Sequence, residues 1–119
     1  MKKLTFVDLF AGCGGLSLGL EQAGFSPVYV NELNKDAMES YLMNRRMHFP
    51  HLDKYKSYDI KEAIKNEAIF KDLRGKNIDL VCGGPPCQGF SNIGIRRSYS
   101  VEKRQLPSNH LFEDMAYFI

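Results

Sequence analysis

Short apolar runs alternate with segments of helical periodicity along this chain. The apolar runs are of the kind that is buried on both faces of a parallel sheet, and they cover residues 4–10, 27–31 and 78–82. Between and after them, apolar side chains recur every three or four residues, as in a helix with one buried face. These helical segments cover residues 16–23, 34–46, 62–73 and 109–119. A weaker strand is expected at residues 58–60.

Residues typical of helix boundaries mark the ends of these segments. Asn34 is a suitable N-cap for the second helix, and Pro50 stops that helix. Gly24 and Gly75 lie where the first and third helices are expected to end. The periodicity also predicts the buried face of each helix, namely Leu16, Gly19, Leu20 and Ala23 in the first, Ala37, Met38, Tyr41 and Leu42 in the second, and Ala63, Ile64, Ala68 and Ile69 in the third.

Strands that alternate with helices predict a parallel sheet whose strands are joined by right-handed crossovers. We therefore expect an α/β fold, with a doubly wound sheet and helices on both of its faces. The 119 residues suffice for one domain with a single hydrophobic core. Ligands in such folds bind beyond the carboxyl ends of the strands, so the loops that follow the strands are the first candidates for a functional site.

Composition excludes several classes of protein. An apolar share of 44% and a charged share of 25% are those of a globular protein, and no segment approaches the roughly 18 apolar residues of a membrane span. We expect a cytoplasmic protein without a membrane partner. The net charge of +2 is too small to indicate nucleic-acid binding by itself. The three cysteines and three histidines lack metal-ligand spacing, so no metal site and no disulfide are predicted.

A glycine-rich turn follows the first strand, in the run Phe10-Ala11-Gly12-Cys13-Gly14-Gly15. Glycines at this place allow a ligand to approach the backbone. Glu32 follows the second strand, where a carboxylate can accept hydrogen bonds from the hydroxyls of a ribose. These features predict a cofactor that contains a nucleoside. Ser17 stands where a dinucleotide fingerprint has its third glycine, which disfavours a nicotinamide cofactor. The alternative is a tight turn beside a solvated Glu32.

The last predicted strand leads into a second motif, Gly84-Pro85-Pro86-Cys87-Gln88. Two consecutive prolines restrict the backbone, so the Cys87 thiol is held on a stiff loop at the edge of the sheet where the cofactor is expected. Position and rigidity suit a nucleophile. For Cys13 and Cys82 we expect the ordinary role of a small buried apolar side chain.

With these two motifs, the chain resembles the DNA cytosine-5 methyltransferase family over nearly its whole length. Residues 8–17 match its first conserved block and residues 84–91 its nucleophile block. The resemblance implies a partial Rossmann-like fold that uses S-adenosylmethionine, with Cys87 as the catalytic thiol that attacks a cytosine flipped out of double-stranded DNA. It implies these cofactor contacts: Phe10, Gly12, Gly14, Leu16, Glu32, Asp59, Ile60, Gly84 and Leu111.

The segment after the nucleophile is basic, with Arg96, Arg97, Lys103 and Arg104 against Glu102. In the family this stretch is a loop that closes over DNA, where arginines would meet phosphates. The alternative is an ordinary solvated loop. The resemblance implies substrate contacts from Pro86, Gln88, Ser91, Arg96 and Arg97.

Several blocks of the family are absent from these 119 residues: the Glu-Asn-Val segment, the Gln-x-Arg-x-Arg block, the target-recognition region and the closing helix. We therefore expect residues 1–119 to be the amino-terminal portion of a catalytic domain, inactive by itself, with an unpaired sheet edge beside the strand that precedes Cys87. A cognate restriction endonuclease is a possible partner of the whole system. A tRNA cytosine-5 methyltransferase and a non-catalytic remnant or binding module stay open as alternatives.

Overall fold

The computed structural model describes residues 3–85 and 111–119, except the side chain of Phe112. The chain divides into two compact units, Met1–Gly84 and Pro85–Ile119. The first unit contains a sheet and the helices that cover it. Within the described part of the second unit, α6 (Leu111–Ala116) forms a short helix, which confirms the helical pattern predicted there.

Three parallel strands form the sheet of the first unit. They are β1 (Thr5–Leu9), β2 (Ser26–Asn31) and β3 (Leu80–Gly83), in the order β2-β1-β3. The central strand β1 is almost wholly buried, because it pairs on both sides and is covered on both faces. Leu9 is the register partner of Asn31 in β2 and of Gly83 in β3. The three strands therefore end side by side.

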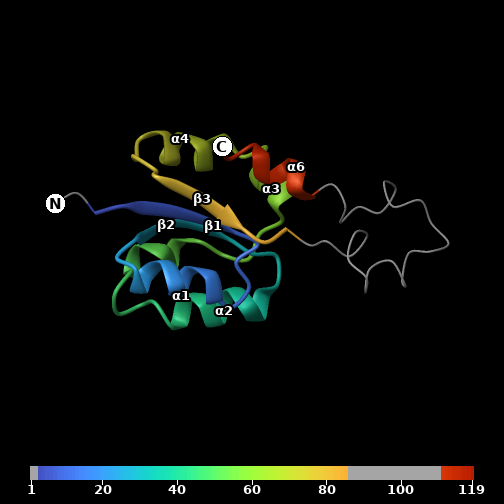
Figure 1. Ribbon diagram of the computed structural model, residues 1–119. Helices are drawn as coiled ribbons and strands as arrows, with labels where there is room; N and C mark the ends of the chain where they lie inside the picture. Colours follow the sequence, from blue (N-terminus) through green and yellow to red (C-terminus); the bar gives the residue numbers. More distant parts are fainter. Residues whose placement is uncertain (1–2, 86–110) are drawn as a thin grey trace, which may run out of the picture. The chain divides into compact units, whose positions relative to one another are not determined.

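Helices cover both faces of this sheet, as predicted (Figure 1). On one face lie α1 (Gly15–Gln22) and α2 (Lys35–Met43). On the other lie α3 (Ile60–Ala63) and α4 (Glu67–Arg74). A 3-10 helix, η1 (Pro50–Lys54), lies in the segment after α2. No helix in the described ranges is long and apolar enough to cross a membrane.

The core beneath α2 agrees with the predicted helix face. Met38 and Tyr41 are buried with Val30 of β2 and Leu52 of η1. The predicted N-cap is also confirmed, because Asn34 Oδ1 accepts a hydrogen bond of 2.9 Å from the Ala37 amide. The helix ends at Met43, a turn earlier than the pattern indicated.

The predicted face of α1 is wrong. Leu16 is 50% exposed, and Gly19 and Ala23 also lie at the surface. The one buried side chain of α1 is Ser17, which hydrogen-bonds to Asp8 beneath the helix. A polar contact, rather than an apolar stripe, fixes how this helix faces the sheet.

The segment between β2 and β3 differs from the prediction in two ways. No strand forms at residues 58–60; Asp59 instead caps α3 through a 2.9 Å hydrogen bond from the Lys61 amide. The single helix expected at residues 62–73 is two helices, because Asn66 begins a new one by accepting a 3.0 Å hydrogen bond from the Ala68 amide. Gly75 ends α4, as predicted.

Candidate functional site

The site predicted from sequence lies at the carboxyl edge of the sheet. Since Leu9, Asn31 and Gly83 are register neighbours, the residues that follow them emerge together. These are the glycine-rich turn after β1, Glu32 after β2 and Gly84 after β3. A direct hydrogen bond of 3.2 Å from the Ala11 amide to the Asn31 carbonyl joins the glycine-rich turn to the last residue of β2.

Glu32 links the ends of β1 and β2. Its Oε1 accepts a hydrogen bond of 2.8 Å from the Gly12 amide, and its Oε2 accepts one of 2.8 Å from the Asn34 amide. The carboxylate is thus held by backbone on both sides instead of standing free in solvent. An ionised carboxylate has about four acceptor sites, so further hydroxyl donors, such as those of a ribose, can still bind to it.

Three residues of the glycine-rich turn have a left-handed backbone conformation. Phe10, Gly12 and Gly14 have φ values of 56°, 59° and 99°, all in the left-handed region that glycine occupies readily. A Cβ added to Gly12 would meet nothing within 4 Å. Open space beside Gly12 is what close approach of a ligand to the backbone requires. Leu16, half exposed, follows at the start of α1.

The predicted adenine-side residues lie next to the end of β2. The Tyr58 amide donates a hydrogen bond of 2.9 Å to the Glu32 carbonyl, and this brings Asp59 and Ile60 close to the same edge. Asp59 Oδ1 is engaged by its own helix α3. Ile60 is only 4% exposed, so its side chain offers little surface to a ligand.

Gly83 and Gly84 lead from β3 into the second motif. A Cβ on Gly83 would lie 2.3 Å from the Leu9 carbonyl oxygen, whereas one on Gly84 would meet nothing within 4 Å. Leu111 opens α6 in the second unit. The remaining predicted residues lie outside the described residues: Pro86, Cys87, Gln88, Ser91, Arg96 and Arg97.

The two described cysteines differ from each other. Cys13 is exposed, so the expectation of a buried apolar role is wrong for it, because the glycine-rich turn leaves its side chain in solvent. Cys82 is half-buried in β3, and its Sγ donates to the Val7 carbonyl at 3.3 Å. Burial, with a smaller effect of the Asp8 charge, raises the pKa of the Cys82 thiol to about 11. Cys82 therefore remains protonated, and a weak nucleophile, at neutral pH.

A buried polar cluster lies beneath the glycine-rich turn, and the sequence reasoning did not identify it. Asp8 Oδ2 accepts a hydrogen bond of 2.5 Å from Ser17, whose hydroxyl also lies 2.7 Å from the Tyr41 hydroxyl. Desolvation raises the pKa of Asp8, although the Ser17 hydrogen bond and the Arg45 charge oppose that rise. The available signal was Asp8 itself, a charged residue within an apolar run.

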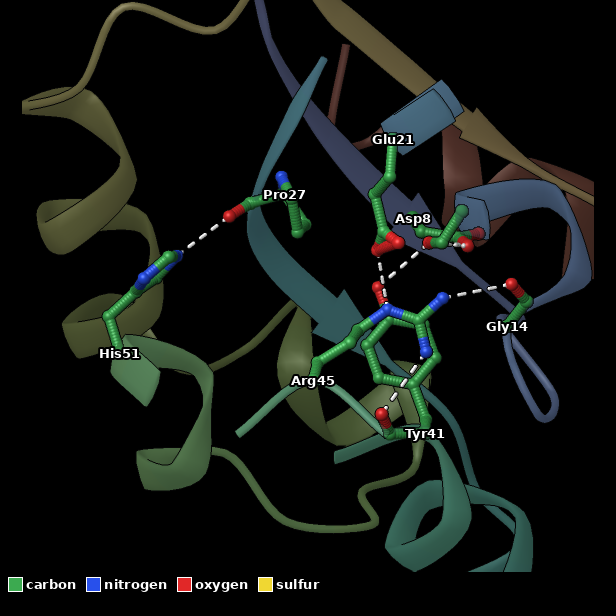
Figure 2. Close-up of polar contacts among 8 residues, drawn as sticks. Asp8, Gly14, Glu21, Pro27, Tyr41, Arg45 and His51 are labelled. Carbon is green, nitrogen blue, oxygen red and sulfur yellow. Dashed lines mark hydrogen bonds and ion pairs between the residues drawn. The ribbon is translucent and has the colours of Figure 1, made fainter. Parts of the chain in front are cut away.

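Arg45 belongs to the same cluster (Figure 2). Its Nε forms an ion pair of 2.5 Å with Glu21, and its two terminal nitrogens donate to the carbonyls of Tyr41 and Gly14 at 3.1 and 3.0 Å. The guanidinium carbon lies 3.8 Å from the centre of the Tyr41 ring. Nothing in the sequence pattern distinguished Arg45 from the neighbouring Arg46, since both follow the apolar stripe of α2.

Comparison with known proteins gives a consistent result. A family model described as C-5 cytosine-specific DNA methylase matches residues 4–119. The type II methyltransferase M1.HphI of Haemophilus parahaemolyticus is 35% identical over 93% of this chain and 27% of its own length. The type II methyltransferase M.AgeI of Thalassovita gelatinovora is 43% identical over 76% of this chain and 20% of its own.

A solved structure is similar as well. It is the crystal structure of an Escherichia coli protein described as a DNA modification methyltransferase encoded within a prophage. Its superposition on this chain gives a TM-score of 0.56 at 37% sequence identity. The similarity covers 74% of this chain and 24% of that one. The chain thus spans between 20% and 27% of the length of these three proteins.

Proposed function

Because the chain belongs to the C-5 cytosine-specific DNA methylase family, we propose that the protein transfers a methyl group from S-adenosylmethionine to C5 of cytosine in DNA. The observation that supports this most directly is the Glu32 carboxylate, which joins the glycine-rich turn to the end of β2 through the Gly12 amide. That arrangement suits a cofactor with a ribose. The descriptions of the family and of the similar solved protein both name DNA, which favours DNA over tRNA as the substrate.

The cofactor pocket that we propose is lined by loops at one sheet edge. Glu32 accepts hydrogen bonds from the ribose hydroxyls, and the backbone at Gly12 lies against the cofactor. Gly84 leaves room on the β3 side, and Asp59 borders the adenine together with the backbone of Ile60, whose side chain is buried. Phe10, Gly14 and Leu16 complete the proposed contacts of the first unit, and Leu111 is proposed as a cofactor contact on the resemblance alone. When bound there, S-adenosylmethionine supplies an electrophilic methyl group on a sulfonium sulfur.

Cys87 is the proposed nucleophile. Its thiolate forms a bond to C6 of cytosine, and the displaced electron pair makes C5 nucleophilic enough to attack the methyl carbon. The methyl–sulfur bond breaks, and S-adenosylhomocysteine leaves. Loss of the proton from C5 and elimination of the Cys87 sulfur from C6 then restore the aromatic ring. Cys82 cannot replace Cys87 in this role, because its raised pKa keeps it protonated.

The substrate must leave the duplex to reach a thiol within a protein pocket. We propose that Pro86, Gln88 and Ser91 surround the flipped cytosine, and that Arg96 and Arg97 contact phosphates. The named type II relatives also suggest a restriction–modification system, with an endonuclease that acts on the same sequence in the cytoplasm.

Covalent trapping tests the proposed chemistry. Duplex DNA containing 5-fluorocytosine cannot lose a proton from C5, so the product of the complete gene should remain bonded to it in the presence of S-adenosylmethionine. Cys87→Ala should form no adduct, whereas Cys13→Ala, which removes the exposed thiol of the glycine-rich turn, should still form one. Denaturing electrophoresis separates adduct from free protein. An adduct with Cys87→Ala, or none with the unaltered protein, would overturn the proposal.

A further inference from the structure

The Arg45 side chain is buried although it is charged and lies in the segment after α2. It is 5% exposed, and each of its three nitrogens is bonded to a different group: the Glu21 carboxylate, the Tyr41 carbonyl and the Gly14 carbonyl. A buried arginine costs free energy unless it is paired and fully hydrogen-bonded. Arg45 is paired with Glu21, and each of its nitrogens has a hydrogen-bond partner, in α1, in α2 or in the glycine-rich turn.

The contact with Gly14 is close and specific. Gly14 has a φ of 99° and precedes the first residue of α1, and a Cβ there would lie 2.7 Å from both terminal nitrogens of Arg45. The Gly14 carbonyl accepts a second hydrogen bond, of 2.9 Å, from the Leu18 amide. The guanidinium therefore fits against a bare backbone, where any side chain would displace it.

The glycine-rich turn is thus held from two sides. Glu32 binds it at the Gly12 amide on the side of the proposed cofactor, and Arg45 binds it at the Gly14 carbonyl on the side of α2. Gly12, Gly14 and Gly15 give this turn more backbone freedom to lose on binding a ligand than other residues would. Fixing it in advance lowers that cost and raises affinity.

We propose that Arg45, oriented by Glu21, is a positioning residue that fixes the glycine-rich turn in its cofactor-binding conformation. The identity of the cofactor in this proposal rests on the proposed function. The claim that Arg45 fixes the conformation of the turn does not depend on it. Arg45 acts through the Gly14 carbonyl and does not itself contact the cofactor.

Hydrogen exchange of the ligand-free protein tests the structural part. Arg45→Met combined with Glu21→Gln removes the ion pair without leaving an unpaired buried carboxylate, and Arg45→Lys keeps the charge but cannot bond to three groups in the same geometry. Both variants should take up deuterium faster in peptides covering residues 10–16. Arg46→Met is the matched control, because Arg46 is 58% exposed and pairs with Asp53 at the surface.

Calorimetry with S-adenosylhomocysteine tests the consequence for binding. We expect the Kd to rise at least about tenfold, equivalent to about 1.4 kcal/mol, in both Arg45 variants and to stay unchanged in Arg46→Met. In the active protein the KM for S-adenosylmethionine should rise while kcat changes little. Should the double variant fail to fold, Arg45→Lys decides the question.

The two proposals fail in distinguishable ways. If the unaltered protein binds no S-adenosylhomocysteine, the proposed function is wrong, while the exchange measurement still decides whether Arg45 orders the turn. If folded Arg45 variants keep both the exchange rate of residues 10–16 and the affinity of the unaltered protein, the positioning role is wrong and the proposed function stands.

Discussion

Gly83 and Gly84 are adjacent at the end of β3, yet a side chain would meet different surroundings at each. The Cβ of Gly83→Ala would lie 2.3 Å from the Leu9 carbonyl oxygen, a backbone atom within the pairing of β1 and β3. The strands would have to separate locally, so we expect the free energy of unfolding to fall by roughly 1–3 kcal/mol or more. Chemical denaturation monitored by circular dichroism measures the change.

Gly84→Ala is the matched control for that substitution. Its Cβ would meet nothing within 4 Å, so the free energy of unfolding should change by no more than about 0.5 kcal/mol. Equal losses in the two variants would contradict the steric explanation. If Gly84 borders the cofactor, as proposed, its variant should weaken binding of S-adenosylhomocysteine even though it folds normally.

The buried Asp8 carboxyl predicts a dependence of stability on pH. Desolvation raises its pKa in the folded protein above 3.8, so the folded state binds more protons than the unfolded state just above that pH. Stability from this group is complete below pH 3.8 and is lost as the pH rises through the folded-state pKa. Asp8→Asn removes the titration and can still accept the Ser17 hydrogen bond. Relative to Asp8→Asn, the unaltered protein should therefore lose stability as the pH rises from 3.8.

Asp72 provides a comparison of opposite sign. A hydrogen bond from Lys54, with smaller effects of Lys76 and Tyr55, lowers the pKa of Asp72. Its contribution is present above the unfolded value and is lost on acidification. Relative to Asp72→Asn, the unaltered protein should lose stability as the pH falls. Urea unfolding at closely spaced pH values compares the three proteins, and parallel curves for all three would contradict both assignments.

At the scale of the elements, the residues that begin helices decide where the sequence prediction succeeds. Asn34 was predicted as an N-cap and is one, since a polar residue ahead of an apolar stripe is a clear signal. The N-cap at Asn66 was not predicted, because apolar residues recur at helical spacing on both sides of it. Its side chain hydrogen-bonds to the backbone and so competes with the continuation of the preceding helix. The pattern also predicts a strand at Asp59, whose side chain instead caps the start of α3.

Capping by Asn66 can be measured. Asn66→Ala removes the acceptor of the Ala68 amide and should lower the free energy of unfolding by about 1 kcal/mol. Asn66→Asp keeps an acceptor and should retain most of the stability. Thermal melts of both variants, beside Asn77→Ala at an exposed position, provide the measurement. An Asn66→Ala variant as stable as Asn77→Ala would show that the break between α3 and α4 has another cause.

The orientation of α1 shows a limit of apolar patterning. Leu16 and its neighbours at helical spacing suggested the buried face, but Ser17 is the residue that packs against β1. Helical periodicity is judged from apolar side chains alone. It therefore does not predict the burial of Ser17, whose hydroxyl is hydrogen-bonded to Asp8 and Tyr41. The same omission concealed Arg45, whose burial depends on partners from three separate segments.

For the whole molecule, the sequence predicted the α/β sheet and the position of the glycine-rich turn and Glu32 at one sheet edge, because parallel strands place their carboxyl ends together. The hydrogen bond between Gly12 and Glu32 was not predicted. The position of β1 between β2 and β3 follows from long-range pairing, which local patterns do not contain. The buried polar contacts beneath the glycine-rich turn could likewise be identified only from the structure. Short motifs in the sequence indicated the family. The conformation of those motifs depends on contacts such as that of Arg45 with Gly14, which link residues far apart in the sequence.

Cofactor binding should stabilise the entire first unit, because Glu32 joins two of its strands at the site. A ligand that binds only the folded state adds about 2.7 kcal/mol at a concentration one hundred times its Kd, a rise in Tm of roughly 10 °C for a chain of this size. S-adenosylhomocysteine should therefore raise the Tm of the unaltered protein, and Glu32→Gln should lose most of that rise.

Glu39→Gln separates this effect from the mere loss of a negative charge. Glu39 is exposed on α2, away from the Gly12 and Asn34 amides that hold Glu32, so its variant should keep the full rise in Tm. Differential scanning fluorimetry over a range of ligand concentrations provides the comparison. If Glu32→Gln keeps the same rise as Glu39→Gln, the ribose is not bound through Glu32, and the carboxylate serves only to join the glycine-rich turn to β2.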